Sequence, residues 1–132
     1  MKAVIILDNS LPKGLLINTA SILSIILGTK IENIIGPNTL DKSKILHHGV
    51  IKFPLPILET DKSELKKIYN IALQKKIFIA DFTTLAQKCK TYDEYIKKIS
   101  NTKNEELDFI GLALVGDKNI INKITGNLKS LK

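Results

Sequence analysis

The sequence predicts an α/β protein, a three-layer α/β/α sandwich whose single sheet is mixed, mainly parallel and four-stranded. Three observations lead to this fold class. The apolar run from Lys2 to Asp8 has the pattern of a strand and turns at once into an apolar helix, Leu15 to Leu27. Strand and helix patterns then alternate along the chain. Finally, 132 residues suit one domain with its own core, here residues 1–132.

Strands are predicted at four places, 2–8, 55–59, 77–81 and 108–115. Pro54 and Pro56 cannot donate to a ladder, so the second strand should lie at a sheet edge or enter the sheet late. Gly111 in the fourth strand indicates a bulge or a close approach of another backbone.

The helices carry recognisable start signals. Asp61 and Glu64 form a capping-box pattern, and Thr91 and Glu94 repeat it, while Gly116-Asp117 opens the last helix. The helix from Leu15 to Leu27 is apolar almost all round. It is therefore expected to be among the most buried helices, packed against the sheet on one side and against something else on the other.

The amino-acid composition of the chain limits the classes of function that it fits. The net charge of +7 favours a nucleic-acid partner, but all 20 basic residues are lysine, and arginine is the residue best suited to bidentate phosphate recognition. RNA is therefore kept only as a lesser candidate partner. The longest apolar run is too short to span a bilayer, and Asp8 interrupts any signal-peptide pattern. With a single cysteine, Cys89, the chain is expected to be cytoplasmic and to have no membrane partner.

No cofactor and no metal are predicted. Glycine-rich phosphate-binding motifs are absent from the chain. The adjacent His47 and His48 would point to opposite faces of an extended segment, which disfavours a shared ion and favours solvation or hydrogen bonding. Cys89 has no histidine near it in the sequence, so an inert thiol is favoured, although Lys88 and Lys90 would lower the pKa of an exposed one.

The strongest candidate site is the turn between the first strand and the first helix. Lys13 adds a charge to the free N–H groups of a helix start, where an anion binds well. Asp8 and Asp81 both end predicted strands, and ligands of open α/β sheets collect at the carboxyl ends of strands. We therefore expect Asp8, Lys13, Asn18 and Asp81 to lie around one cleft that binds a small anionic ligand. The alternative for the aspartates is that each caps the turn that follows it.

Small polar residues recur along the first helix at Asn18, Ser21 and Ser24. They could line a pocket, or they could permit close packing with their hydroxyls bonded to the backbone one turn earlier. Packing is favoured for the two serines. Asn18 is the stronger site candidate, because a buried amide has more hydrogen bonds to satisfy.

Several segments together resemble the family known as domain of unknown function 2000 and, through it, the type II peptidyl-tRNA hydrolase fold. They are Leu11-Pro12, Leu16-Ile-Asn18-Thr-Ala20, Leu55-Pro-Ile-Leu58, Ala80-Asp81-Phe-Thr83, Phe109 to Gly116 and Lys123-Ile-Thr-Gly126-Asn-Leu-Lys129. Aligned on Gly14, however, Leu15, Thr19 and Ile22 stand where the hydrolases have lysine, glutamine and histidine. Of their second motif only Asp81 is matched.

Two functions follow as expectations. The first is a binding protein that takes a small anionic ligand or a macromolecular partner and lacks standard hydrolase activity. A second copy of the chain, in a homodimer, is one candidate partner. The second is a divergent hydrolase of peptidyl-tRNA or a related ester, with Asp81, Thr84 and Lys13 as the catalytic candidates. Leu15 favours the first, because an apolar side chain cannot supply the charge of the missing lysine.

Overall fold

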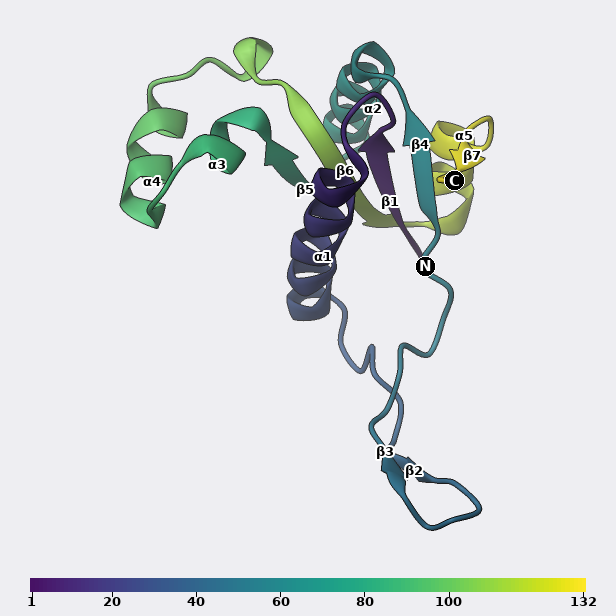
Figure 1. Ribbon diagram of the computed structural model, residues 1–132. Helices are drawn as coiled ribbons and strands as arrows, with labels where there is room; N and C mark the ends of the chain where they lie inside the picture. The colour runs from purple at the N-terminus through teal and green to yellow at the C-terminus, as the bar shows by residue number, and fades with distance from the viewer.

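The structure is a computed structural model that describes residues 1–132, and it contains a five-stranded mixed sheet with helices on both faces (Figure 1). The strand order is β5-β6-β1-β4-β7. The elements are, in chain order, β1 Lys2–Asp8, α1 Lys13–Lys30, β2 Thr39–Leu40, β3 Leu46–His47, β4 Ile57–Thr60, α2 Lys62–Lys75, β5 Phe78–Thr83, α3 Thr84–Lys88, α4 Tyr92–Ser100, the 3₁₀ turn Asn104–Glu106, β6 Phe109–Gly116, α5 Lys118–Thr125 and β7 Lys129–Ser130.

The prediction of a four-stranded, mainly parallel sheet is wrong in strand number and in strand direction. Only β1 and β4 are parallel neighbours, whereas β6 is antiparallel to both β1 and β5, and β7 is antiparallel to β4. β7 has only two residues, which are too few to show an alternating apolar pattern in the sequence. The insertion of β6 between β1 and β5 depends on pairing between distant segments, which local patterns do not report.

The positions of the four predicted strands are confirmed to within a few residues. β4 begins at Ile57, just after the two prolines, so this strand enters the sheet late. Pro56 still serves the ladder as an acceptor, because the amide of Ile5 donates to its carbonyl at 3.0 Å. The cap predictions are confirmed as well: Asp61 accepts from the amide of Glu64 at 2.8 Å, and Thr91 from that of Glu94 at 3.1 Å.

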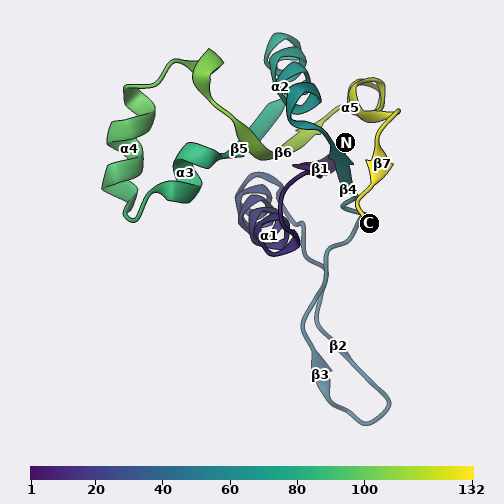
Figure 2. The same cartoon turned by 45° about the horizontal axis from the view of Figure 1, so that its top comes forward.

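Alternate side chains of β1 feed two separate apolar layers, as the strand period of two requires. Ile5 and Leu7 pack against α1 on one face. Val4 and Ile6 pack against α2 and α5 on the other. Figure 2 shows α1 on one side of the sheet and the other two helices on the opposite side. The three-layer α/β/α arrangement is therefore present.

α1 is buried on one side only, which corrects the expectation of burial on two. The buried stripe consists of Leu16, Thr19, Leu23 and Leu27. On the opposite side Ile17 is 59% exposed and Ile25 is 71% exposed. No other element covers this side, because the segment after α1 leads away from the sheet (Figure 1).

That segment, residues 33–52, is called the arm below. It contains β2 and β3, which pair with each other outside the main sheet. Both views show it extending away from the body of the molecule (Figures 1 and 2). None of the helices combines the length and the apolar character that crossing a membrane requires.

Candidate functional site

A pocket of about 380 Å³ lies between α1, β5 and the α3–α4 hairpin, a size that suits a small ligand. Its lining is mostly apolar and comes from all four elements and from the loop that joins α3 to α4. The lining residues are Ile22, Ile26, Asp81, Phe82, Ala86, Cys89, Lys90, Thr91, Tyr92 and Tyr95.

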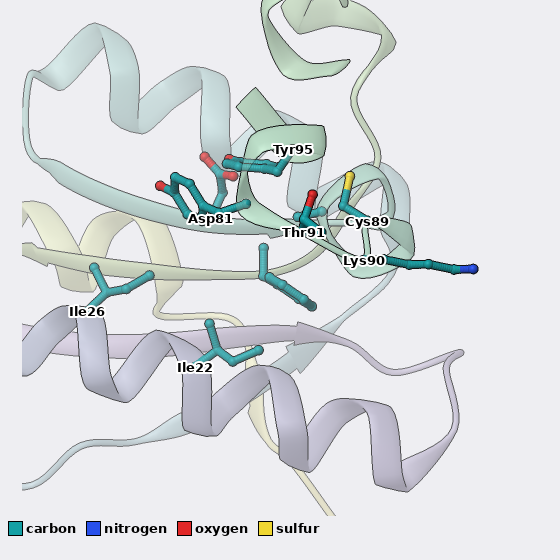
Figure 3. Close-up of a pocket in the computed structure, with 10 residues that line it drawn as sticks. Ile22, Ile26, Asp81, Cys89, Lys90, Thr91 and Tyr95 are labelled. Atoms are coloured by element: carbon teal, nitrogen blue, oxygen red, sulfur yellow. The ribbon is translucent and has the colours of Figure 1, made fainter. Parts of the chain in front are cut away.

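The walls of the pocket are set by local sequence signals. Ile22 and Ile26 are four residues apart and therefore lie on one side of α1, from which both point toward the hairpin (Figure 3). The hairpin itself is held by caps. Thr83 accepts a hydrogen bond from the amide of Ala86 at 3.1 Å at the start of α3, and Glu94 accepts one from the amide of Lys90 at 2.9 Å before α4.

Asp81 is the only acidic group in the pocket. It lies within β5, opposite Leu112 of β6, and its side chain is half-buried. Burial raises the pKa of this carboxyl, and no hydrogen bond or nearby cation offsets the effect. The prediction that the strand ends at Asp81 is wrong, because Phe82 and Thr83 continue the pairing with β6. An unpartnered carboxyl thus faces a largely apolar space.

Tyr95 is the polar neighbour of Asp81, and its ring lies beside the carboxyl (Figure 3). Burial, with the nearby charge of Asp81 as a second cause, raises the pKa of the Tyr95 hydroxyl. Tyr92 stacks edge-on against Tyr95, with ring centroids 5.6 Å apart. Together with Phe82, three of the chain's seven aromatic residues border this one pocket.

Two further polar side chains of the pocket are those of Cys89 and Lys90. The thiol of Cys89 donates to the carbonyl of Leu85 at 3.2 Å, which agrees with the expectation of an inert cysteine. Lys90 extends away from Asp81 (Figure 3). No group of three His, Cys, Asp or Glu side chains is arranged to hold a metal ion.

The structure does not bring the four predicted site residues into one cleft. Asp8 is buried in its own turn, where its carboxylate accepts from the amide and the hydroxyl of Ser10 at 2.9 and 2.7 Å. Asn18 is exposed and borders no pocket. Lys13 borders a different hollow from the one that contains Asp81. The turn-capping alternative thus describes Asp8, and only Lys13 and Asp81 remain candidates for ligand contact.

The serines of α1 meet part of each alternative, because both border a groove beside the helix and both bond to the backbone one turn earlier. The hydroxyl of Ser21 donates to the carbonyl of Ile17 at 3.0 Å, and that of Ser24 donates to the carbonyl of Ala20 at 2.7 Å. Thr84 is the first residue of α3 and borders no pocket. Tyr92 and Tyr95 were not singled out from the sequence as site residues. Their spacing of three on a short amphipathic helix was the signal that the chain offered.

Asp81→Asn is expected to stabilise the protein near neutral pH, before any ligand is added. Because burial raises the pKa of Asp81 in the folded state above 3.8, its ionisation opposes folding. Stability is lost as the pH rises from the unfolded pKa through the raised folded one, and the loss stays constant above it. Denaturant unfolding at several pH values should show a gain for the variant near pH 7 that disappears at low pH. An equal gain at every pH would contradict this assignment.

The comparisons with known proteins support the fold and assign no role to the residues of the pocket. A family model described as a protein of unknown function, DUF2000, matches residues 1–132. The solved structure of a protein of unknown function, Atu0240 from Agrobacterium tumefaciens str. C58, is similar, with a TM-score of 0.90 and 21% identity over 99% of this chain and 97% of that one. No curated protein matches the chain.

Proposed function

The chain belongs to the DUF2000 family of proteins of unknown function, and we propose from its geometry that it is a binding protein for a small, largely apolar amine in its cationic form. The observation that carries the proposal is Asp81, a carboxyl without a charged partner in a pocket bordered by three aromatic rings. An ammonium group would supply the missing partner, and aromatic faces attract cations.

The two parts of such a ligand have separate places to bind. The ammonium group would donate to the carboxylate of Asp81, a charge-assisted bond whose loss costs about 1.5–3 kcal/mol. The apolar part would contact Ile22, Ile26 and Phe82 and bury surface that is now open to water. Binding should tighten as the pH rises through the raised pKa of Asp81, because only the ionised carboxyl attracts the cation.

The anionic ligand expected from the sequence has one remaining candidate place, the hollow beside Lys13. Lys13 and Lys132 border it, and no side chain caps the start of α1. Glu59 borders the same hollow and opposes an anion. In the pocket of Asp81, the carboxyl likewise disfavours an anion. We therefore place the cationic ligand first and keep the anion at Lys13 as the second candidate.

The hydrolase alternative gains no support from the arrangement of its candidate residues. Asp81, Thr84 and Lys13 share no pocket, whereas general acid–base catalysis requires groups within hydrogen-bond reach of one substrate. The resemblance to type II peptidyl-tRNA hydrolases stays a prediction.

The proposal is tested with three ligands of similar shape and different charge: 2-phenylethylammonium, 2-phenylethanol and 3-phenylpropionate. Chemical-shift titrations should show that the ammonium compound binds most tightly and shifts residues of the Asp81 pocket. In Asp81→Asn the affinity for the ammonium compound should fall about 10- to 100-fold, while that for the alcohol changes little.

Asp93→Asn is the matched control, since Asp93 is an exposed aspartate of α4 that does not border the pocket. This variant should bind the ammonium compound as the natural chain does. If the two variants lose affinity equally, or if 3-phenylpropionate binds most tightly at Asp81, the proposal is overturned. Binding of the anion at Lys13 alone would favour the second candidate.

A further inference from the structure

The arm is a defined hairpin that packs on nothing in its own chain. β2 and β3 pair through Thr39 with His47 and Leu40 with Leu46, and a further bridge joins Ile35 to Ile51. Every residue from Pro37 to His48 is exposed. The body of the molecule therefore contributes no packing to the outer half of the arm (Figures 1 and 2).

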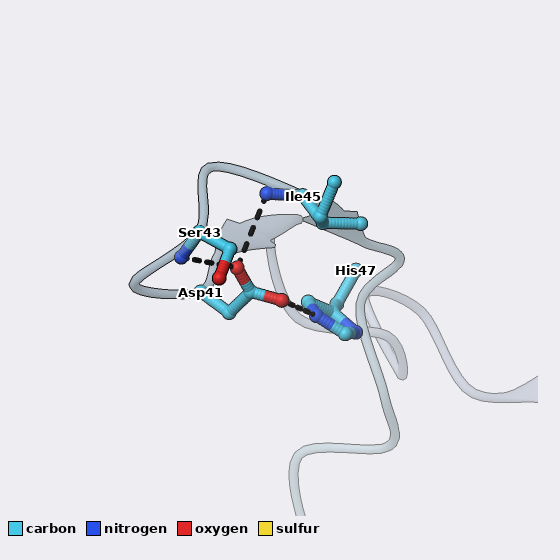
Figure 4. A network of polar contacts seen from close by, with 4 residues as sticks. All are labelled: Asp41, Ser43, Ile45 and His47. Atoms are coloured by element: carbon cyan, nitrogen blue, oxygen red, sulfur yellow. Dashed lines mark hydrogen bonds and ion pairs between the residues drawn. The ribbon is translucent and has the colours of Figure 1, made fainter.

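Specific contacts nevertheless give the arm a fixed shape. At its tip the carboxylate of Asp41 accepts from the amides of Ser43 and Ile45 at 2.8 and 3.2 Å and from the His47 ring at 2.7 Å (Figure 4). The His47 bond is the main reason that the pKa of Asp41 is lowered. Nearer its base, a Cβ at Gly49 would collide with the carbonyl oxygen of Gly36, so the two limbs approach as closely as glycine allows.

Such a hairpin lacks the packing that stable hairpins need. A two-stranded hairpin by itself is marginal in water and requires a third strand or a helix to pack against. The arm instead exposes five large aliphatic side chains, Ile35, Leu40, Ile45, Leu46 and Val50, each by more than half. Exposed apolar surface gathered on one projecting segment is typical of an interaction site.

A matching surface lies on α1 of the same chain. A groove of about 360 Å³ runs beside this helix and is bordered by Ile17, Ser21, Ile57 and Leu131 among others. Residues 15–29 contain no charged side chain, although a quarter of the chain is charged. The hydroxyls of the serines are bonded within the helix, so they do not compete for a partner's polar groups. This groove lies on the opposite side of α1 from Ile22 and Ile26.

The lengths of the two surfaces also agree. An 18-residue helix is about 27 Å long, and eight residues of extended chain, such as 34–41, span about 26 Å. One limb of the arm is thus long enough to follow the groove, which residues 16–24 of α1 border. The arm leads away from its own α1, so the groove that it can reach belongs to another molecule (Figure 1).

We infer that the chain forms a two-fold dimer in which the arm of each copy lies in the α1 groove of the other. A second copy is favoured as the occupant because both halves of the contact are present in one sequence, and closed two-fold contacts are the commonest in oligomers. Two copies of charge +7 repel each other, which the uncharged groove mitigates. A specific interface needs about 1,000 Å² or more of buried surface, and a two-fold dimer would bury the arm–groove contact twice.

Sedimentation velocity over a range of concentrations tests this inference. The natural chain should have twice the mass of one chain. Leu46→Asp in the arm and Ile17→Asp in the groove should each weaken the dimer by about 100-fold or more, because each places a charge in an apolar contact. Leu73→Asp on α2 is the control, since Leu73 is also an exposed leucine of a helix and lies outside the contact. It should leave the mass unchanged.

Disulfide trapping tests which surfaces meet. In a Cys89→Ser background, copies with cysteine at Leu40 or Leu46 are mixed with copies with cysteine at Ile17 or Ser21. At least one mixture should give a disulfide-linked pair, and a mixture of Leu46→Cys with Leu73→Cys should give none. A monomer at every concentration, a dimer that Ile17→Asp does not weaken, or trapping only between two arms would each overturn the inference.

Discussion

Leu23→Ala in α1 is expected to lower the free energy of unfolding by about 2–5 kcal/mol. Leu23 has no exposed surface and packs into the layer between α1 and the sheet, where Ile5 and Leu7 are its neighbours from β1. The substitution removes buried methyl groups and leaves a cavity that close-packed neighbours fill only in part. Denaturant unfolding, with an unchanged slope, measures the loss.

Leu73→Ala is the matched control for this prediction. The same atoms are removed from a helix, but Leu73 is 49% exposed on α2. Its loss should stay within about 0.5 kcal/mol. If Leu73→Ala costs as much as Leu23→Ala, the assignment of the buried stripe of α1 is wrong.

The sequence predicted the helix α1 but not which side of it is buried. Existence and extent of the helix followed from its apolar run and from the preceding strand. Its inner and outer sides did not, because Ile17 and Ile25 are as apolar as Leu16 and Leu23. A helix that is apolar all round carries no periodic signal for the side that faces the sheet. The exposed side is also the one that we infer to be covered by a second copy.

Local signals predicted the elements, whereas the sheet depended on distant pairing. Caps such as Asp61 and Thr91 act within one turn of a helix, so three or four residues determine them. The order β5-β6-β1 brings together segments from opposite ends of the chain. The same distinction explains the site. Asp81 was recognised as a candidate, but Tyr95 reaches it only because the capped α3–α4 hairpin folds back over β5.

The four residues expected around one cleft are separated for a related reason. Asp8 and Asp81 were expected to end strands at the sheet edge where Lys13 begins the first helix, and this shared edge suggested a cleft at the start of α1. In the structure the turn after β1 uses Asp8 for its own hydrogen bonds, and the helix carries Asn18 to its exposed side. The pocket forms instead where α1 passes β5, four residues further along the helix at Ile22.

Gly111→Val is expected to be more damaging still, lowering the free energy of unfolding by about 3 kcal/mol or more. A Cβ at this position of β6 would lie 2.6 Å from Cδ2 of Leu7, 3.0 Å from Cγ2 of Thr19 and 3.2 Å from the carbonyl oxygen of Ile6. All three neighbours belong to buried residues, so none has room to move away. Gly111 indicated a bulge or a close backbone approach, and the pairing of β5 with β6 does shift register here, between Phe82 opposite Gly111 and Thr83 opposite Phe109.

Three further substitutions distinguish this steric effect from the general cost of replacing a glycine. Gly111→Ala should cost about 1–3 kcal/mol, because one methyl group already enters the contact. Gly14→Ala, where nothing lies within 4 Å of the added atom, should be neutral or stabilising by up to about 1 kcal/mol. Thr19→Ser removes the methyl group that faces Gly111. Combined with Gly111→Ala, it should recover about 0.5 kcal/mol or more relative to the sum of the single changes. Strict additivity would show that α1 does not press on β6 at this point.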